Sequence, residues 1–397
     1  MSTKWDNDEV IQRLREYLRI PSVHPDIDYG DCVKFLKKQA SLLGLPVVVH
    51  EFVPKKPVVV MTWEGLEPEL PSILLNSHMD VVPVYEEHWT HPPFDAVITD
   101  DGFIYARGTQ DMKGIGMMHL EAVKRLKDAG VRLRRTVNIC FVPDEEIGGI
   151  DGMRAFSEST EFKKLNVGFA LDESGPNPHP SEIIAFCDER TSRQIIVTCR
   201  GEPGHGSLLV SETAGEKLHY IIDKFMTFRA AEKKKADKGI WYGDLTTINL
   251  TQISGGVQIN VLPETLTVLF DIRIAPDVDH DEFERTISRW CKEAGEGVSF
   301  EYIVKNPQVK GTRIDDLPFW TVMEKVVTDM GFSTRFVTCP GATDARYIRH
   351  QGIPAINFSP LLNTEMLLHC HDEKIHIDAF MKGIDIIEKV IEAVANV

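Results

Sequence analysis

The order of apolar runs along the chain constrains its fold more than any other feature of the sequence. In the first 189 residues, short apolar runs typical of strands alternate with segments of helical periodicity. One apolar run, Ile73–Leu75, is followed by a helix expected from about Asp111 to Ala129 and by a buried strand expected at Thr136–Val142. Because strands that alternate with helices are typical of layered α/β folds, we expect an α/β domain.

The pattern changes near Arg190. A strand, a helix, two strands, a helix and a strand are expected between residues 190 and 306. This βαββαβ order is that of a ferredoxin-like α+β module. Since the earlier pattern resumes afterwards, we expect residues 190–306 to form a domain inserted into a larger one made of residues 1–189 and 307–397. Two domains also suit a chain of 397 residues, which exceeds what one hydrophobic core usually supports.

Composition excludes several classes of function. The formal net charge of −16 and the lack of a basic stripe make nucleic acid an unexpected partner. The sequence has no apolar run near the ~18 residues that span a bilayer, so we expect no membrane partner. The first ten residues do not resemble a signal peptide. Seven cysteines without a CxxC pair indicate reduced thiols, so we expect a cytoplasmic protein.

The apolar run Ile73–Leu75 leads into His78 and Asp80. Strand alternation places these two side chains on the same side, so the Asp80 carboxylate can accept a hydrogen bond from the His78 ring. The same spacing occurs at His376 and Asp378, where we interpret Asp378 as the N-cap of the last helix. Taken alone, His78 suits a metal ligand and an ordinary polar residue equally well.

Asp111 lies where a loop is expected to become a helix. A carboxylate there is commonly an N-cap, stabilised by the helix dipole. Its alternative role, as a ligand that bridges metal ions, depends on whether other carboxylates converge on it.

Further acids follow two expected strands. Three come after Thr136–Val142, and two come after Val167–Leu171: Asp144, Glu145 and Glu146, then Asp172 and Glu173. Packed carboxylates raise one another's pKa unless a cation neutralises them, so these acids predict a shared cation site. Near the end of the sequence, His369 and His371 offer two imidazoles separated by one residue. Only one of them is expected to face such a site.

Together these positions provide ligands for two divalent ions. The expected set consists of two imidazoles and three carboxylates: His78, Asp111, Glu146, Glu173 and His371. It suits two zinc ions per subunit that share one carboxylate and keep open positions for water. The three ligand acids and Glu145 carry a charge of −4, which two Zn²⁺ would balance.

Nine short motifs are distributed over nearly the whole chain. They are LLNSHMDVV at 74–82, ARGTQDMKG at 106–114, PDEEIGG at 143–149, DESG at 172–175, PGHGS at 203–207, GGVQIN at 255–260, FDIR at 270–273, GATDAR at 341–346 and HDE at 371–373. In this order and spacing they resemble the M20 metallopeptidase family. The resemblance implies a zinc-peptidase-like α/β catalytic domain with a mixed sheet, and an inserted lid and dimerisation domain.

The resemblance also assigns roles. One zinc would be held by His78, Asp111 and Glu173, and the other by Asp111, Glu146 and His371. Glu145 would be the general base, and Asp80 the acid that orients the histidine. The peptide bond Asp111–Met112 would be cis. Members of the family that act on N-acyl amino acids, like its carboxypeptidases, carry Glu at the position of Glu173, whereas its aminopeptidases carry Asp.

Four further residues receive roles from the resemblance. His205, between two glycines, would stabilise the oxyanion in a site shared with a partner subunit. Without the resemblance, we would interpret it as a histidine in a flexible loop. Asn260, Arg273 and Arg346 would bind the substrate carboxylate, which a guanidinium fits with two hydrogen bonds. For Arg273, a solvated or salt-bridged side chain is the alternative.

The expected function is therefore the zinc-dependent hydrolysis of N-acyl-L-amino acids, such as N-acetyl amino acids, to a free amino acid and a carboxylate. We expect a homodimer formed through the inserted domain. Two alternatives remain at this stage: a dipeptidase or carboxypeptidase that uses the same two metals, and a metal-free binding protein that has kept the fold.

Overall fold

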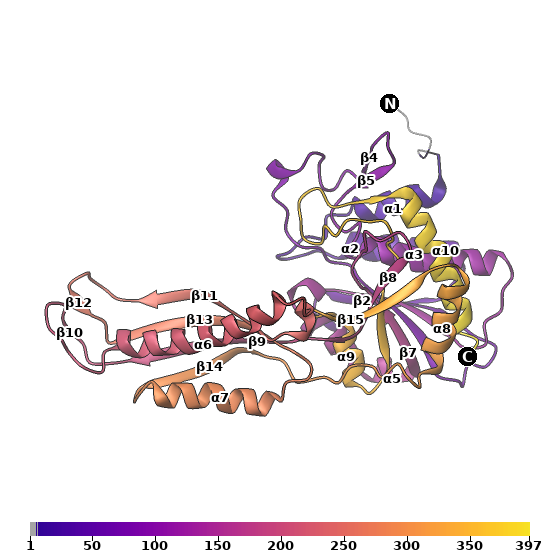
Figure 1. Cartoon of the computed structure of the whole chain (residues 1–397). Coiled ribbons are helices and arrows are strands. Elements are labelled where there is room, and N and C mark those ends of the chain that lie inside the picture. The colour runs from indigo at the N-terminus through magenta and orange to yellow at the C-terminus, as the bar shows by residue number, and fades with distance from the viewer. Residues whose placement is uncertain (1–4, 6) are drawn as a thin grey trace. The chain divides into compact units, whose positions relative to one another are not determined.

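The structure is a computed structural model that describes residues 5 and 7–397. The chain divides into two compact units, of which the first holds residues up to Cys187, 312–337 and 343–397 (Figure 1). The second unit holds residues 188–311 and 338–342. These limits differ by a few residues from the expected ones. The segment 338–342 joins the second unit because Trp241 Nε1 donates a 2.7 Å hydrogen bond to the carbonyl of Thr338.

A large mixed sheet forms the centre of the first unit. Its strands lie in the order β1 (Val47–Val53), β2 (Lys56–Trp63), β6 (Val137–Val142), β3 (Ser72–His78), β7 (Val167–Asp172), β16 (Ala355–Phe358), β8 (Glu182–Glu189) and β15 (Ser333–Cys339). β3 pairs in parallel with β6 and β7, whereas β2 pairs antiparallel with β1 and β6. This arrangement confirms the predicted α/β fold with a mixed sheet.

Helices cover both faces of this sheet. One face packs against α1 (Glu9–Leu18), α2 (Gly30–Leu43), α3 (Lys113–Asp128), α8 (Pro318–Asp329) and α10 (Ile377–Val394). The other packs against α4 (Ala155–Ser157), α5 (Thr160–Lys164) and α9 (Ala345–His350). Along β2, Val59 and Met61 enter the first core while Val58 and Val60 enter the second. A sheet buried on both faces has strands that are apolar throughout, as the sequence shows.

Local signals fix several helix ends. The Asp8 side chain caps α1 by accepting hydrogen bonds from the amides of Val10 and Ile11. Gly44 ends α2 in the left-handed conformation, with φ at 60°. The interpretation of Asp378 as N-cap of α10 is wrong: His376 is the cap, and its ring accepts a hydrogen bond from the Asp378 amide.

A smaller sheet of the first unit connects distant parts of the chain. It contains β4 (Val97–Ile98), β5 (Phe103–Tyr105) and β17 (Lys374–His376), with β5 in the middle. In the antiparallel pair of β5 and β17, Ile104 lies opposite Ile375. This pairing brings the segment before α3 beside the segment before α10.

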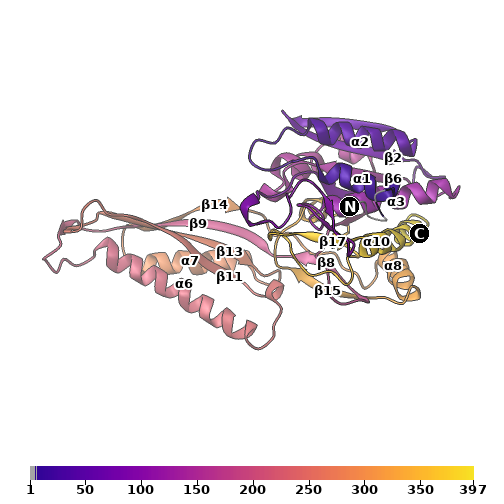
Figure 2. The ribbon, with the colours of Figure 1, turned by 90° about the horizontal axis from the view of Figure 1, so that it is seen from above.

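The second unit has the predicted βαββαβ order. Its elements are β9 (Thr191–Arg200), α6 (Ala214–Ala236), β11 (Thr247–Gly255), β13 (Thr265–Ile274), α7 (His280–Glu293) and β14 (Val298–Lys305). The strands form an antiparallel sheet in the order β11-β13-β9-β14, with both helices on one face (Figure 2). The stacked rings of Phe225 and Phe270, with centroids 4.0 Å apart, lie in the core between the sheet and the helices. Two short strands, β10 (Gly204–His205) and β12 (Val261–Leu262), pair separately.

Five of the cysteines are free thiols: Cys32, Cys140, Cys199, Cys291 and Cys370. Within residues 5 and 7–397, no helix combines the length and the apolar character needed to cross a membrane.

Candidate active site

Three neighbouring parallel strands deliver polar side chains to one edge of the large sheet. β3 ends at His78, β6 leads into a short 3-10 turn that begins at Glu145, and β7 is followed by Glu173. Carboxyl ends of parallel strands are the usual place for sites in α/β folds. His78 is fully buried, and Glu145 and Glu173 are each 9% exposed. The ligand atoms of these three residues lie within 4.8 Å of one another.

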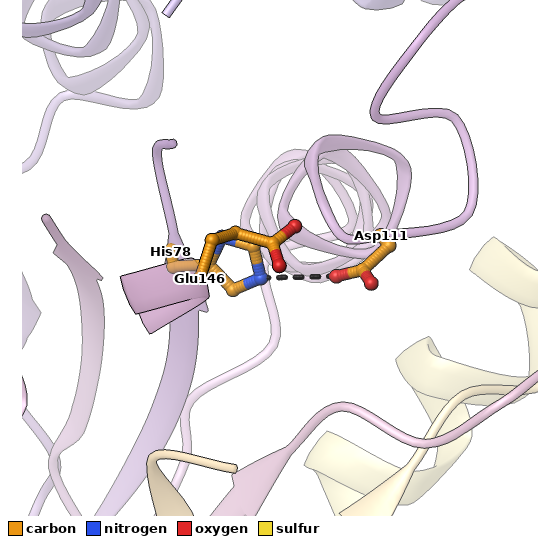
Figure 3. A group of neighbouring side chains, drawn as sticks. All are labelled: His78, Asp111 and Glu146. Atoms are coloured by element: carbon orange, nitrogen blue, oxygen red, sulfur yellow. Dashed lines mark hydrogen bonds and ion pairs between the residues drawn. The ribbon is translucent and has the colours of Figure 1, made fainter. Parts of the chain in front are cut away.

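Asp111 lies between two histidines. Its Oδ1 atom is 3.1 Å from Nε2 of His78 (Figure 3), and its Oδ2 atom is 3.2 Å from Nε2 of His369. The bond from Asp111 to Met112 is a cis peptide, as the family resemblance implied. Asp111 is not a helix cap, since α3 begins at Lys113 and its N-cap is Met112. Of its two readings, the structure therefore favours the one in which both carboxylate oxygens serve the site.

Each of these histidines also faces a glutamate. Nε2 of His78 lies 3.4 Å from Oε1 of Glu173, and Nε2 of His369 lies 3.1 Å from Oε2 of Glu146. The site thus consists of two half-sites, each with one imidazole, one glutamate and one oxygen of Asp111. The ligand atoms of His78, Asp111 and Glu146 lie within 4.8 Å of one another (Figure 3).

His371, which the sequence analysis selected, does not join this group. Its exposed ring packs beside His88, with centroids 5.1 Å apart, and edge-on to Tyr85. The two histidines lie in a turn, where His369 has a φ of 60°. Because a turn does not alternate its side chains as a strand does, the spacing could not tell which imidazole faces the acids. The structure replaces His371 with His369.

Electrostatics within the group favour a cation. Burial, followed by repulsion from Asp111, raises the pKa of Glu146 to about 7, and burial raises the pKa values of Glu145 and Glu173 well above their usual range. Hydrogen bonds to Asp111 and Glu146 raise the pKa of His369 to about 10. Without a metal, then, these side chains retain protons that a divalent ion would displace.

The donor set fits zinc. It supplies imidazole nitrogens and carboxylate oxygens, the usual partners of Zn²⁺ in catalytic sites. The buried Oε1 atom of Glu146 has no hydrogen-bond partner among the described residues, as expected for an atom reserved for a metal. The His369 side chain is 55% exposed, so its half-site is open to water.

Asp80 contacts both His78 and the loop that carries Glu145 and Glu146. The ring Nδ1 of His78 lies 2.9 Å from the carbonyl oxygen of Asp80, but 3.5 Å from its carboxylate. That carboxylate accepts hydrogen bonds from the amides of Glu145 and Glu146, at 3.2 and 3.0 Å, and from Nε2 of His24, at 2.9 Å. Asp80 therefore fixes the loop that carries both glutamates. No motif signalled His24.

Two of the acids after the strands face away from the group. Asp144 accepts a 2.7 Å hydrogen bond from the Tyr29 hydroxyl and pairs with Lys56. Asp172 accepts hydrogen bonds from Nδ2 of Asn76, at 3.0 Å, and from the amide of Ala345, at 2.7 Å. These carboxylates stabilise the surrounding fold.

The remaining predicted residues lie in both units. In the second, His205 is exposed beside Ser207 Oγ at 2.7 Å, Asn260 accepts a hydrogen bond from Gln258, and Arg273 forms a 2.9 Å ion pair with Asp271. Arg273 thus has the contact that its alternative reading predicts.

Arg346 belongs to the first unit, where it donates to the carbonyls of Thr343, at 2.8 Å, and Gly148, at 2.9 Å. Gly148 follows the turn of Glu145 and Glu146, so Arg346 also supports that turn.

The comparisons with known proteins agree with this fold. Residues 74–393 match the model of peptidase family M20/M25/M40, and the chain belongs to that family. Among its relatives, mouse aminoacylase-1 is 46% identical over 387 residues, which cover 97% of this chain and 95% of the relative.

Solved structures share the fold. The M20 family metallo-carboxypeptidase Sso-CP2 from Sulfolobus solfataricus has a TM-score of 0.76 at 20% identity, covering 98% of this chain and 99% of that one. The Bacillus subtilis YXEP protein, described as a dinuclear metal binding peptidase from the M20 family, has a TM-score of 0.66 at 15% identity, covering 96% and 97%.

Proposed function

We propose that this protein hydrolyses the amide bond of N-acyl-L-amino acids, releasing an L-amino acid and a small carboxylate such as acetate. The observation that carries the proposal is the carboxylate of Asp111, whose two oxygens each face a histidine that is paired with a glutamate. Identity of 46% to an aminoacylase-1 over nearly the full length supports this substrate class.

The proposed cofactor is a pair of zinc ions. His78 and Glu173 would hold one ion, His369 and Glu146 the other, and Asp111 would bridge them. Bound there, the ions would lower the pKa of a water molecule toward ~7 and polarise the acyl carbonyl.

Glu145 is the proposed general base. The residue is 9% exposed, and its carboxylate lies in the group formed with His78 and Glu173. It would accept a proton from the attacking water and deliver a proton to the leaving amine. The Glu145 amide is anchored on Asp80, so the carboxyl group stays directed at the site during the reaction.

Four side chains are the proposed substrate-binding residues. His205 would stabilise the oxyanion, and Asn260, Arg273 and Arg346 would bind the substrate carboxylate. Local positive groups are needed because a protein with a net charge of −16 repels an anionic substrate at long range. The two carbonyls that hold Arg346 fix the plane of its guanidinium, whereas Arg273 would exchange its partner Asp271 for the substrate.

The second unit is the proposed lid and dimerisation domain. It carries apolar side chains that are almost fully exposed, at or near the short β10–β12 pair: Leu209 at 106%, Ile259 at 103% and Val257 at 89%. Exposed apolar clusters commonly mark protein interfaces. We propose that a second copy of the chain covers them in a cytoplasmic homodimer.

Two measurements test the function. Metal analysis of the purified protein should find two zinc ions per chain, and N-acetylmethionine should be hydrolysed faster than dipeptides. Preference for dipeptides would favour a dipeptidase or carboxypeptidase on the same site. A protein without metal and without hydrolytic activity would contradict the proposal.

A further inference from the structure

Two buried side chains tie the loop that carries Asp111 to the loop that carries His369. We propose that Glu373 and Gln110 are positioning residues, which hold Asp111 and His369 at the separation that the second metal ion requires. This inference rests on the two-metal site of the proposed function and adds to it two residues outside the ligand set.

Glu373 acts as an acceptor for the Asp111 loop. Its side chain is fully buried, and its two carboxylate oxygens accept hydrogen bonds from different groups of the same loop. Oε1 accepts from the Gln110 amide at 2.7 Å, Thr109 Oγ1 at 3.2 Å and the Asp111 amide at 3.4 Å; Oε2 accepts from Arg107 Nη1 at 2.7 Å and the Gly108 amide at 3.1 Å. With these donors directed to one point, the backbone at Asp111 has little freedom to rotate.

Gln110 connects the two loops in the opposite direction, from the Asp111 loop to the His369 loop. Its side chain, 1% exposed, reaches from the Asp111 loop to the segment on either side of His369. Nε2 donates to the carbonyls of Glu365, at 3.0 Å, and Lys374, at 2.8 Å, and Oε1 accepts from the amide of Leu367, at 2.9 Å. The turn that contains His369 is therefore held at both ends by a residue adjacent to Asp111.

Backbone pairing completes the connection. The amide of Ala106 donates to the carbonyl of Glu373 at 3.1 Å, which continues the antiparallel pair of β5 and β17. The 3.2 Å separation of His369 and Asp111 thus follows from contacts made by residues that touch neither metal position. Such outer contacts typically contribute 10–100-fold to metal affinity.

The test is a zinc titration of metal-free protein against a competing chromophoric chelator. We expect Glu373→Gln and Gln110→Ala each to weaken the binding of one zinc ion by about 10–100-fold. The affected step should be the one that His369→Ala abolishes, and the other step should stay within about twofold of the wild type. Gln110→Ala leaves in place all the groups that donate hydrogen bonds to Glu373, since Gln110 contributes its backbone amide there. This variant therefore decides the question alone if Glu373→Gln does not fold.

Asp372→Asn is the matched control. Asp372 is the acid next to Glu373, but it accepts its two 2.7 Å hydrogen bonds from Thr90. Asparagine tolerates the positive φ of 56° at this position, so zinc affinity should not change. Melting temperatures of the metal-free variants separate positioning from general stability: a lower melting temperature with unchanged zinc affinity would overturn the inference.

Wild-type measurements separate this inference from the proposed function. If the wild type binds two zinc ions but does not cleave N-acetylmethionine, the function fails while the titration still decides the positioning role. If the wild type binds two zinc ions and both variants bind them with the same affinity as the wild type, the positioning role alone fails. A wild type that binds fewer than two zinc ions would overturn both.

Discussion

Nε2 of His369 lies 3.1 Å from a carboxylate oxygen of Glu146, although 223 residues separate the two in the chain. This contact distinguishes His369 from His371, which packs on His88 instead. The pair therefore provides a direct test of the site.

We predict that His369→Ala loses one zinc ion per chain and at least about 100-fold in kcat, because one half-site loses its imidazole. His371→Ala should keep both ions and most of the activity. Metal analysis and initial rates on N-acetylmethionine check both variants. Full metal content in His369→Ala would refute the assignment of the second half-site.

Glu145→Gln should bind both zinc ions and lose about 10²–10⁴-fold in kcat, because an amide of the same shape cannot accept the proton of the attacking water. KM should change much less than kcat. The matched variant Glu161→Gln, on the surface helix α5, controls for loss of a carboxylate. An active Glu145→Gln enzyme would exclude this residue as the base.

His119 on α3 should make the protein sensitive to acid. Burial lowers its pKa from 6.5 to about 4, and neither ring nitrogen has a hydrogen-bond partner among the described residues. The unfolded chain binds a proton at higher pH than the folded one. The neutral ring therefore contributes stability that is fully present above pH 6.5 and falls by up to about 3 kcal/mol as the pH approaches 4.

His119→Met should remove this contribution. The difference in free energy of unfolding between wild type and variant, measured by urea titration at several pH values, should change between pH 6.5 and 4 and stay constant above. His219→Met, an exposed change on α6, controls for the loss of a histidine. A pH-independent difference would show that His119 does not titrate in this range.

If His205 serves the site of a partner subunit, two inactive variants should complement each other. Mixing His205→Asn with Glu145→Gln would produce heterodimers that contain one intact site, so part of the activity should return. Size-exclusion chromatography with light scattering verifies the dimers. Confirmed heterodimers without recovered activity would argue that His205 acts within its own subunit, or not at all.

Much of the fold follows from local patterns. Apolar periodicity predicted α3, because this pattern depends only on neighbours in the chain. The βαββαβ order of the second unit was likewise visible as alternating runs. The segment 338–342 lies in the second compact unit, although the sequence pattern groups it with residues 307–397. Its place depends on hydrogen bonds such as that from Trp241 to Thr338, which no local pattern predicts.

The position of a candidate ligand was predictable where the residue ends a strand and not where it lies in a turn. His78 and Glu173 follow buried strands, so their position at the sheet edge could be inferred. The choice between His369 and His371 depends on turn geometry. Two acids of one turn differ in direction for the same reason: Asp144 turns to Tyr29 while Glu146 faces the site. Glu373 gave no signal beyond belonging to a motif.

The wide spacing of the proposed metal ligands along the chain has a consequence for biosynthesis. His78, Asp111, Glu146 and Glu173 all precede the second unit, whereas His369 follows it. A ribosome must therefore complete the whole insertion before the last imidazole exists. The half-site of His369 cannot assemble on an unfinished polypeptide, so full maturation of the proposed centre is a late event in the making of this protein.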